Sequence, residues 1–205
     1  AYEPFVFAKH KDKNSLQTYS DAMKYFVIFS LLIFLGMVLY MDLIKFIIKH
    51  TYWEGLAVVP IILWSFIFQG VYFNLSIWYK LKDKNHYGAW FAAIGTVIIF
   101  VGNIIFVPKF SYWGSAWSAF AGYFVVMLLS YFFGQKHMPI NYQLKKLALY
   151  TVLALVLFVV STFIETPYLI LNLAVKTVLL AIYVAVVVKK DLPLNEFLPY
   201  LKKKG

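Results

Sequence analysis

Long uncharged runs, separated by short lysine-rich segments, dominate the pattern of hydrophobic and polar positions in this chain. Each run approaches or exceeds the roughly 20 mostly apolar residues that carry a helix across about 30 Å of hydrocarbon. The runs are too long and too uniformly apolar for transmembrane β-strands, which alternate over about 10 residues. The pattern therefore predicts six membrane-spanning helices, at residues 25–41, 55–79, 85–108, 110–135, 147–164 and 166–188.

Composition indicates the same class. Of the 205 residues, 62% are hydrophobic, 20% aromatic and only 14% charged, whereas soluble domains carry about 25% charged residues. We therefore expect an all-α fold, a polytopic membrane helix bundle with six transmembrane helices. Cysteine is absent, which excludes disulfides, zinc fingers, iron–sulfur sites and thiol nucleophiles, and arginine is absent as well.

The lysines are divided unevenly between the loops. If successive loops alternate sides, one side holds fifteen lysines and the other holds three, while Lys176 falls inside the last span. Because lysine-rich loops stay on the cytoplasmic side, both ends of the chain are expected there. The net charge of +10 then reflects membrane topology, and we expect no nucleic-acid partner.

These boundaries divide the chain into five segments. Residues 1–24 are expected to form a basic cytoplasmic segment, 25–135 four membrane helices, 136–146 a cytoplasmic loop, 147–188 two further helices, and 189–205 a basic cytoplasmic tail. The chain opens with Ala1 and has no room for a complete span before the first basic segment. We therefore expect it to be the C-terminal piece of a longer protein.

A polar stripe runs along the second span. Its five side chains recur at intervals of four and three residues, so a helix places them on one face, and Lys80 follows at the cytoplasmic end. They are Ser65, Gln69, Tyr72, Ser76 and Tyr79. An unsatisfied amide near mid-membrane costs several kcal/mol, so Gln69 is expected to face either a partner helix or water. Lining of a substrate cavity and helix packing are both open for this stripe.

Small residues characterise the third and fourth spans. Such residues let two helix backbones approach closely, and they predict that the two spans pack as an antiparallel hairpin. The packing positions are Gly88, Gly95 and Gly102 in the third span, and Gly114, Ser118 and Gly122 in the fourth. Asn103, on the same face of the third span, is a candidate for lining a substrate cavity, as are Asn172 and Lys176 of the last span.

Lys176 lies near the centre of the last span, where a lysine costs about 2.5–3.5 kcal/mol. Asn172 shares its helix face. Such a residue is a functional-site hypothesis by default, and the alternatives are a neutral lysine or a structural hydrogen bond to a neighbouring helix. Asp42 and Lys45, three residues apart at the outer end of the first span, are expected to pair with each other.

Motifs for catalysis or cofactor binding do not emerge. The four histidines stand near lysines and have no carboxylate or second histidine at ligand spacing, so no metal is expected. The scattered acids form no general acid–base pair, and there is no glycine-rich phosphate loop. We expect neither an enzyme nor a cofactor.

Four stretches of sequence carry a resemblance. They are Glu3, Pro4 and Phe5 before the first basic segment, the runs 52–60 (YWEGLAVVP) and 74–88 (NLSIWYKLKDKNHYG), and the hairpin 108–117 (PKFSYWGSAW). Together they resemble bacterial polysaccharide and lipopolysaccharide biosynthesis proteins of the flippase type, and the hairpin is the most specific of them. The resemblance covers most of residues 1–150 and, more weakly, the last two spans.

This resemblance implies membership of the multidrug/oligosaccharidyl-lipid/polysaccharide exporter superfamily. Such proteins have two six-helix lobes, often with two added C-terminal helices, and flip undecaprenyl-pyrophosphate-linked oligosaccharide across the bacterial inner membrane by alternating access. On this plan the chain supplies the last six of 12–14 spans. Its partners are then membrane lipid, the lipid-linked oligosaccharide and the N-terminal lobe of its own longer chain. The absence of arginine departs from the family and leaves only lysine point charges for the pyrophosphate.

Three other functions remain open. One is a multidrug-type or other transporter of the same superfamily. The second is a polytopic membrane enzyme of cell-envelope synthesis, which requires convergent His, Arg, Asp or Ser near the interface. The third is a purely structural or assembly membrane protein, against which Gln69 and Lys176 argue because both are polar groups inside spans.

Overall fold

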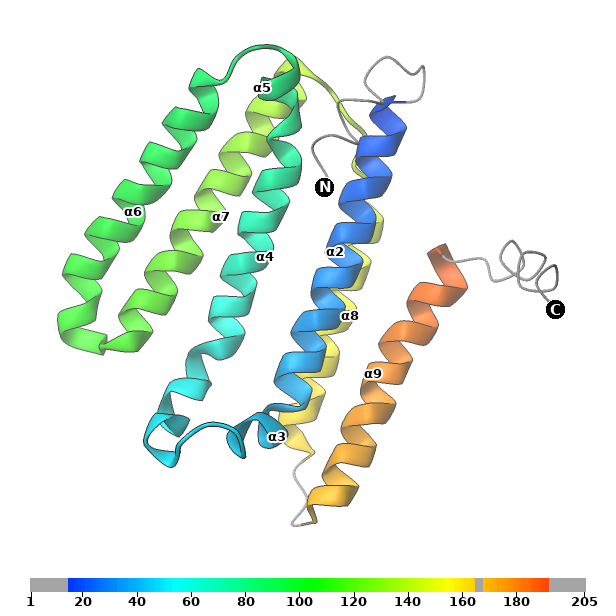
Figure 1. Ribbon diagram of the computed structural model, residues 1–205. Coiled ribbons are helices and arrows are strands. Elements are labelled where there is room, and N and C mark those ends of the chain that lie inside the picture. The colour runs from blue at the N-terminus through cyan, green and yellow to red at the C-terminus, as the bar shows by residue number, and fades with distance from the viewer. Residues whose placement is uncertain (1–14, 165–167, 192–205) are drawn as a thin grey trace. The chain divides into compact units, whose positions relative to one another are not determined.

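All regular secondary structure is helical in residues 15–164 and 168–191, the part of the chain that this computed structural model describes (Figure 1). Six helices there are long and apolar enough to cross a membrane: Ser15–Leu39, His50–Leu81, His86–Phe110, Tyr112–His137, Leu144–Phe163 and Leu169–Asp191. The predicted all-α fold with six spans is therefore confirmed. The Glu3–Phe5 stretch of the resemblance and the expected start of the last span at Thr166 lie outside the described residues.

The first helix, α2 (Ser15–Leu39), begins well before the predicted start at residue 25. The predicted span began after the charged residue Lys24. In the structure the helix includes the charged residues, because their side chains pair with neighbours on the same helix. Gln17 Nε2 donates to Asp21 Oδ2 (3.1 Å), and Lys24 Nζ lies 3.4 Å from Asp21 Oδ1. Pairs at these spacings stabilise a helix, so it continues beyond the apolar run.

The second span is built from three consecutive helical pieces. They are the 3₁₀ helix η1 (His50–Val58), α4 (Val59–Leu75) and α5 (Ile77–Leu81). Pro60 lies in the first turn of α4, where the missing N–H has no helical partner to lose. Ser76 interrupts the helix, and its Oγ donates to the carbonyl of Phe73 (2.6 Å), a bond of the type that bends helices.

Helices α6 (His86–Phe110) and α7 (Tyr112–His137) form the expected hairpin, joined by Ser111 alone (Figure 1). Pro108 was expected to end the third span, but α6 continues to Phe110. Ser111 ends it instead, with a positive φ of 51° and its N–H donated to the carbonyl of Val107 (2.8 Å). A proline in the last turn removes a single backbone bond and so does not stop the helix there.

Contacts group the chain into two compact units. The described part of the first comprises residues 15–27 and 48–144, and within it α7 packs against both α4 and α6. Phe68 of α4 contributes to this core, because its ring centroid lies 5.1 Å from the centroids of both Phe120 and Phe124. Aromatic packing of this kind fixes α4 along α7.

The described part of the second unit comprises residues 28–47, 145–164 and 168–191. It contains the C-terminal half of α2, α3 (Met41–Lys45), α8 (Leu144–Phe163) and α9 (Leu169–Asp191). Phe34 of α2 meets Phe158 of α8 edge to face with centroids 5.7 Å apart, and the Tyr183 hydroxyl of α9 donates to the Ile28 carbonyl (3.1 Å). One face of α9 is buried: Asn172, Lys176, Leu179, Tyr183, Val187 and Asp191.

Large apolar side chains remain exposed along the spans. Examples from five different helices are Phe29, Phe66, Phe100, Val156 and Ile170. Exposed apolar surface on this scale is unfavourable in water, whereas lipid chains solvate it without cost. The exposed faces therefore agree with the lengths of the helices, and the chain has the architecture of a multi-pass membrane protein.

Candidate functional site

The polar stripe of the second span separates into two kinds of residue. The two serines are only 1% exposed and donate to carbonyls of their own helix, Ser65 Oγ to Ile61 (2.9 Å) and Ser76 Oγ to Phe73 (2.6 Å). Tyr79 is also buried, and its hydroxyl lies 3.2 Å from that of Tyr72. These three side chains are engaged in packing within the first unit.

Gln69, Tyr72 and Lys80 are half-buried members of the same stretch. Gln69 makes no hydrogen bond to any residue in the described part of the chain. An amide inside hydrocarbon needs a hydrogen-bond partner. The Gln69 amide, at the middle of a span, has none among the described residues. Of the stripe, Gln69 and Tyr72 are the residues best placed for contact with another polar molecule or segment.

The small-residue positions lie at the contact between α6 and α7. A Cβ added at Gly102 would lie 2.5 Å from Ser118 Oγ, and one at Gly95 would lie 2.7 Å from a methyl group of Val126. At Gly114 it would meet the backbone of Phe106 at 2.5 Å, and at Gly122 it would meet Ile99 at 2.4 Å. Gly88 differs, since its close neighbour is the ring of Tyr79 on α5.

Two asparagines hold buried carboxamide oxygens without a hydrogen-bond partner among the described residues. They are Asn103 of α6, in the first unit, and Asn172 of α9, in the second. An unsatisfied buried acceptor costs about 1–3 kcal/mol, so each marks a place where a donor is missing. Asn172 is the more notable, because a charged group lies one turn away on the same face.

That group is Lys176, which is buried and ion-paired. Its Nζ donates to Oδ2 of Asp42 at 2.6 Å, and the other oxygen of Asp42 accepts from Lys45 Nζ at 3.3 Å. The Asp42–Lys45 contact was predicted from the sequence, whereas the Lys176 contact was not. Asp42 therefore bridges two lysines, one on α9 and one on its own short helix α3.

A second polar contact adjoins this cluster. The Tyr40 hydroxyl lies 2.8 Å from Thr177 Oγ1, and Thr177 also donates to the Leu173 carbonyl at 2.7 Å. Tyr40 immediately precedes α3 and Thr177 follows Lys176, so the two contacts join the same pair of segments. Within the second unit, the segment 40–45 and α9 are thus linked by the Asp42–Lys176 ion pair and the Tyr40–Thr177 hydroxyl contact.

Electrostatics favour the charged form of the central carboxylate. The hydrogen bond from Lys176 is the largest cause that lowers the pKa of Asp42 below its ordinary value of 3.8, and the charges of Lys176 and Lys45 add to it. Partial burial opposes this shift but does not overcome it. One carboxylate between two lysines gives the cluster a formal net charge of +1.

A second ion pair joins the last two helices and was also missed from sequence. Lys146 Nζ of α8 lies 2.7 Å from Asp191 Oδ1 at the end of α9, and the Tyr150 hydroxyl donates to the other oxygen of Asp191. The Asp191 side chain is only 3% exposed, whereas that of Lys146 is 46% exposed. Asp191 follows two lysines at the end of the apolar run, and nothing in that local pattern singles out Lys146 as its partner.

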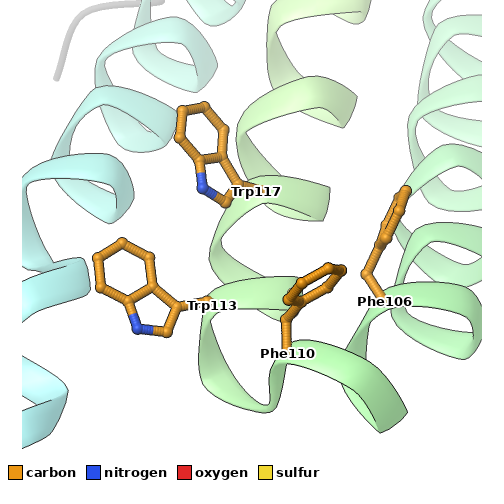
Figure 2. Close-up of a pocket in the computed structure, with 5 residues that line it drawn as sticks. Phe106, Phe110, Trp113 and Trp117 are labelled. Carbon is orange, nitrogen blue, oxygen red and sulfur yellow. The ribbon is translucent and has the colours of Figure 1, made fainter.

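Aromatic side chains gather at two places in the first unit. Near the end of α7, His137 stacks on Trp78 with centroids 5.0 Å apart and an interplanar angle of 13°, and Tyr87 lies beside both rings. At the opposite end of the α6–α7 hairpin, aromatic rings surround a pocket of about 500 Å³ (Figure 2). Its lining is Phe106, Phe110, Trp113, Gly114 and Trp117, which suits hydrocarbon and offers no charge.

Ligands for a metal do not converge in the described residues. No group of three or more His, Asp or Glu side chains lies close enough together there to hold an ion. In this part of the chain lysines pair with Asp21, Asp42 and Asp191, and the cluster at Asp42 and Lys176 is the one beside an unsatisfied amide oxygen. We therefore take Lys176, Asp42, Lys45 and Asn172 as the candidate site of the second unit.

The fold and this site together define a polytopic membrane protein with a buried charged cluster at one of its spans. Comparison of the chain with protein-family models, with curated proteins and with solved structures gives no match. The class therefore rests on the six apolar helices, and the activity is a matter for proposal.

Proposed function

We propose that this chain is the C-terminal part of a flippase that moves undecaprenyl-pyrophosphate-linked oligosaccharide across the bacterial inner membrane, with both of its ends on the cytoplasmic side. The proposal draws on the resemblance of residues 52–60, 74–88 and 108–117 to polysaccharide and lipopolysaccharide biosynthesis flippases. The rest of a longer chain supplies the facing lobe, and the two lobes rock about the substrate in alternating access.

The observation that carries the proposal is the half-buried amide of Gln69 at the middle of the second span. It makes no hydrogen bond within the described residues, although its surroundings along α4 are almost entirely apolar. A polar sugar headgroup crossing the membrane supplies hydroxyls that can donate to and accept from an amide. Gln69 then contacts the headgroup while the polyprenyl chain stays in the bilayer.

Two neighbours of Gln69 extend this contact. Tyr72, one turn along the same stripe, offers a hydroxyl that already lies 3.2 Å from Tyr79. Lys80, at the predicted cytoplasmic mouth, offers a point charge to the pyrophosphate. Ser65 and Ser76 have no part in this mechanism, because they are buried and bonded to their own helix.

The test uses the full-length protein in its host and compares Gln69→Leu with wild type. We expect surface polysaccharide to fall, and lipid-linked oligosaccharide to accumulate in the inner leaflet, at an unchanged level of protein in the membrane. Phe66→Leu is the matched control, since it places the same side chain on an exposed position of the same helix. It should export normally.

Two outcomes count against the proposal. Wild-type export by Gln69→Leu removes this amide from the mechanism. Normal surface polysaccharide after deletion of the whole gene, with no accumulated lipid-linked intermediate, rejects the flippase function itself.

A further inference from the structure

The cluster around Lys176 has more hydrogen-bond donors than the protein uses. An ammonium group carries three N–H donors. Among the described residues, Lys176 and Lys45 each donate only to Asp42, one to each carboxylate oxygen. Two donors on each lysine are therefore free to bind an anion, and the net charge of +1 on the cluster favours one.

The side-chain amide of Asn172, next to this cluster, has an oxygen that lacks a hydrogen-bond donor among the described residues. Asn172 is 8% exposed, and its Oδ1 is buried without a donor in the described part of the chain. It precedes Lys176 by one helical turn on the buried face of α9, which places the two side chains one above the other. A ligand that satisfies both residues must bring an anionic oxygen for the lysines and a hydroxyl donor for Asn172.

Lys176 lies in the N-terminal half of α9. Lys176 follows the first residue of α9, Leu169, by only seven positions, which corresponds to about 10 Å along the helix. A lysine side chain there extends its ammonium toward the membrane surface. Asp42 and Lys45 belong to α3, outside the six apolar spans, so the cluster joins a residue within the α9 span to two residues outside the spans.

The exposed surface of α9 is apolar at the level of this cluster. Ile170, Leu171 and Val178 are all well exposed, on the sides of α9 away from Lys176, where hydrocarbon chains can lie along the helix. A free anion in solution gains nothing from such a surface, whereas a lipid places its polar group at the cluster and its chain along the helix.

We propose that Lys176, Lys45 and Asn172 bind the headgroup of a lipid that carries a phosphate and at least one hydroxyl group. Lys45 and Lys176 donate to the phosphate oxygens, and Asn172 Oδ1 accepts from the hydroxyl. Asp42 is a positioning residue, because it holds the two ammonium groups on either side of one carboxylate. A phosphate-linked sugar and a phosphatidylglycerol both have this chemistry.

The site goes beyond the proposed function, since it belongs to the second unit and its occupation can be measured without transport. A flippase that fails to bind lipid here still exports through Gln69, and a chain that exports nothing can still bind lipid here. The two proposals therefore fail separately.

The experiment measures lipid binding to the full chain in detergent micelles by native mass spectrometry. Three lipids with matched acyl chains test separately for the phosphate and for the hydroxyl group. Phosphatidylglycerol has both, phosphatidylmethanol has the phosphate alone, and a glucosyl diacylglycerol has hydroxyls alone. We expect phosphatidylglycerol to bind about threefold to tenfold more tightly than either of the others. Inorganic phosphate in large excess should not displace it.

Two variants and one control locate the binding. Lys45→Gln leaves the Lys176–Asp42 pair intact and should weaken phosphatidylglycerol about threefold to tenfold. Asn172→Leu should reduce phosphatidylglycerol to the affinity of phosphatidylmethanol and leave phosphatidylmethanol itself unchanged. Lys189→Gln, which removes one exposed charge from the last turn of α9, should change neither.

Three results overturn the proposal. The first is equal weakening by Lys45→Gln and Lys189→Gln, which assigns the effect to overall charge. The second is equal binding of the three lipids by the wild-type chain. The third is displacement of phosphatidylglycerol by inorganic phosphate, which makes the ligand a free anion. If Asn172→Leu does not fold, the comparison of Lys45→Gln with Lys189→Gln still tests the proposed lipid site.

Discussion

Lys176 of α9 and Asp42 of α3 form an ion pair with Nζ and Oδ2 2.6 Å apart, although the two positions differ by 134 in the sequence. Only 11% of the Lys176 side chain and 27% of the Asp42 side chain are exposed. A lysine that would be costly alone in a span is thus half of an ion pair. The cost of breaking such a pair depends on which partner is left behind.

Removal of the Asp42 carboxylate should lower the free energy of unfolding more than removal of the Lys176 ammonium group. Asp42→Asn leaves the buried Lys176 ammonium without its carboxylate, whereas Lys176→Met leaves Asp42 paired with the more exposed Lys45. We expect Asp42→Asn to lower the free energy of unfolding by about 2–4 kcal/mol and Lys176→Met by about 1 kcal/mol. Unfolding in detergent micelles measures both. The double variant Asp42→Leu/Lys176→Met should recover most of the loss, and equal costs for the two single variants would contradict this account.

The Lys146–Asp191 pair should show the reverse order. Here the acid is the buried partner, at 3% exposure, and the lysine is 46% exposed. Lys146→Met should therefore cost about 1–2 kcal/mol, while Asp191→Asn, which keeps an acceptor for the Tyr150 hydroxyl, should cost less. The same unfolding assay applies. Lys145→Met, a change to the exposed neighbouring lysine, serves as the control and should leave stability unchanged.

Acid should weaken the second unit through Asp42. Because the folded state lowers the pKa of Asp42 below its ordinary value of 3.8, the pair contributes its full stability above pH about 4. The contribution disappears as the pH falls through the lower pKa of the folded state. We expect the difference in melting temperature between wild type and Asp42→Asn to be constant from pH 7 to 5 and to shrink below pH about 4. A difference that persists unchanged at pH 3 argues against an ionised Asp42.

Two glycines in different helices should respond oppositely to alanine. A Cβ at Gly114 would lie 2.5 Å from the backbone of Phe106, which cannot move without shifting α6. Gly114→Ala should therefore cost about 1–3 kcal/mol. Gly36 of α2 has nothing within 4 Å of an added Cβ, so Gly36→Ala should be neutral or stabilise the helix by about 0.5–1 kcal/mol. Equal effects at the two sites would show that helix propensity, and not close packing, determines the change in stability.

Much of the fold was predictable because it depends on local properties. Six apolar runs correspond to six helices, and the single-residue connection at Ser111 confirms the pairing of α6 with α7. Helix ends were less predictable, since Asp21 pairs locally and keeps α2 helical beyond the apolar run. The cytoplasmic location of the basic segments stays a prediction from the lysine distribution.

The candidate site was predictable only in part. The sequence identified Lys176 and Asn172 as polar residues within a span, but it did not predict which residues surround them. The stripe from Ser65 to Tyr79 appeared uniform in sequence, whereas the structure divides it, because Ser65 and Ser76 bond to carbonyls one turn back. A hydroxyl that returns to its own helix cannot be told from one that faces a cavity by spacing alone.

The amino-acid sequence by itself determined that this chain is helical and crosses a membrane six times, because the transfer of each run into lipid depends on its own residues and adds along the chain. Tertiary structure alone decided that Lys176 meets Asp42 and that Asp191 meets Lys146 and Tyr150. Such contacts depend on which helix faces come together within the second unit. In lipid that choice is made by packing and by the need to pair buried charges, not by hydrophobicity.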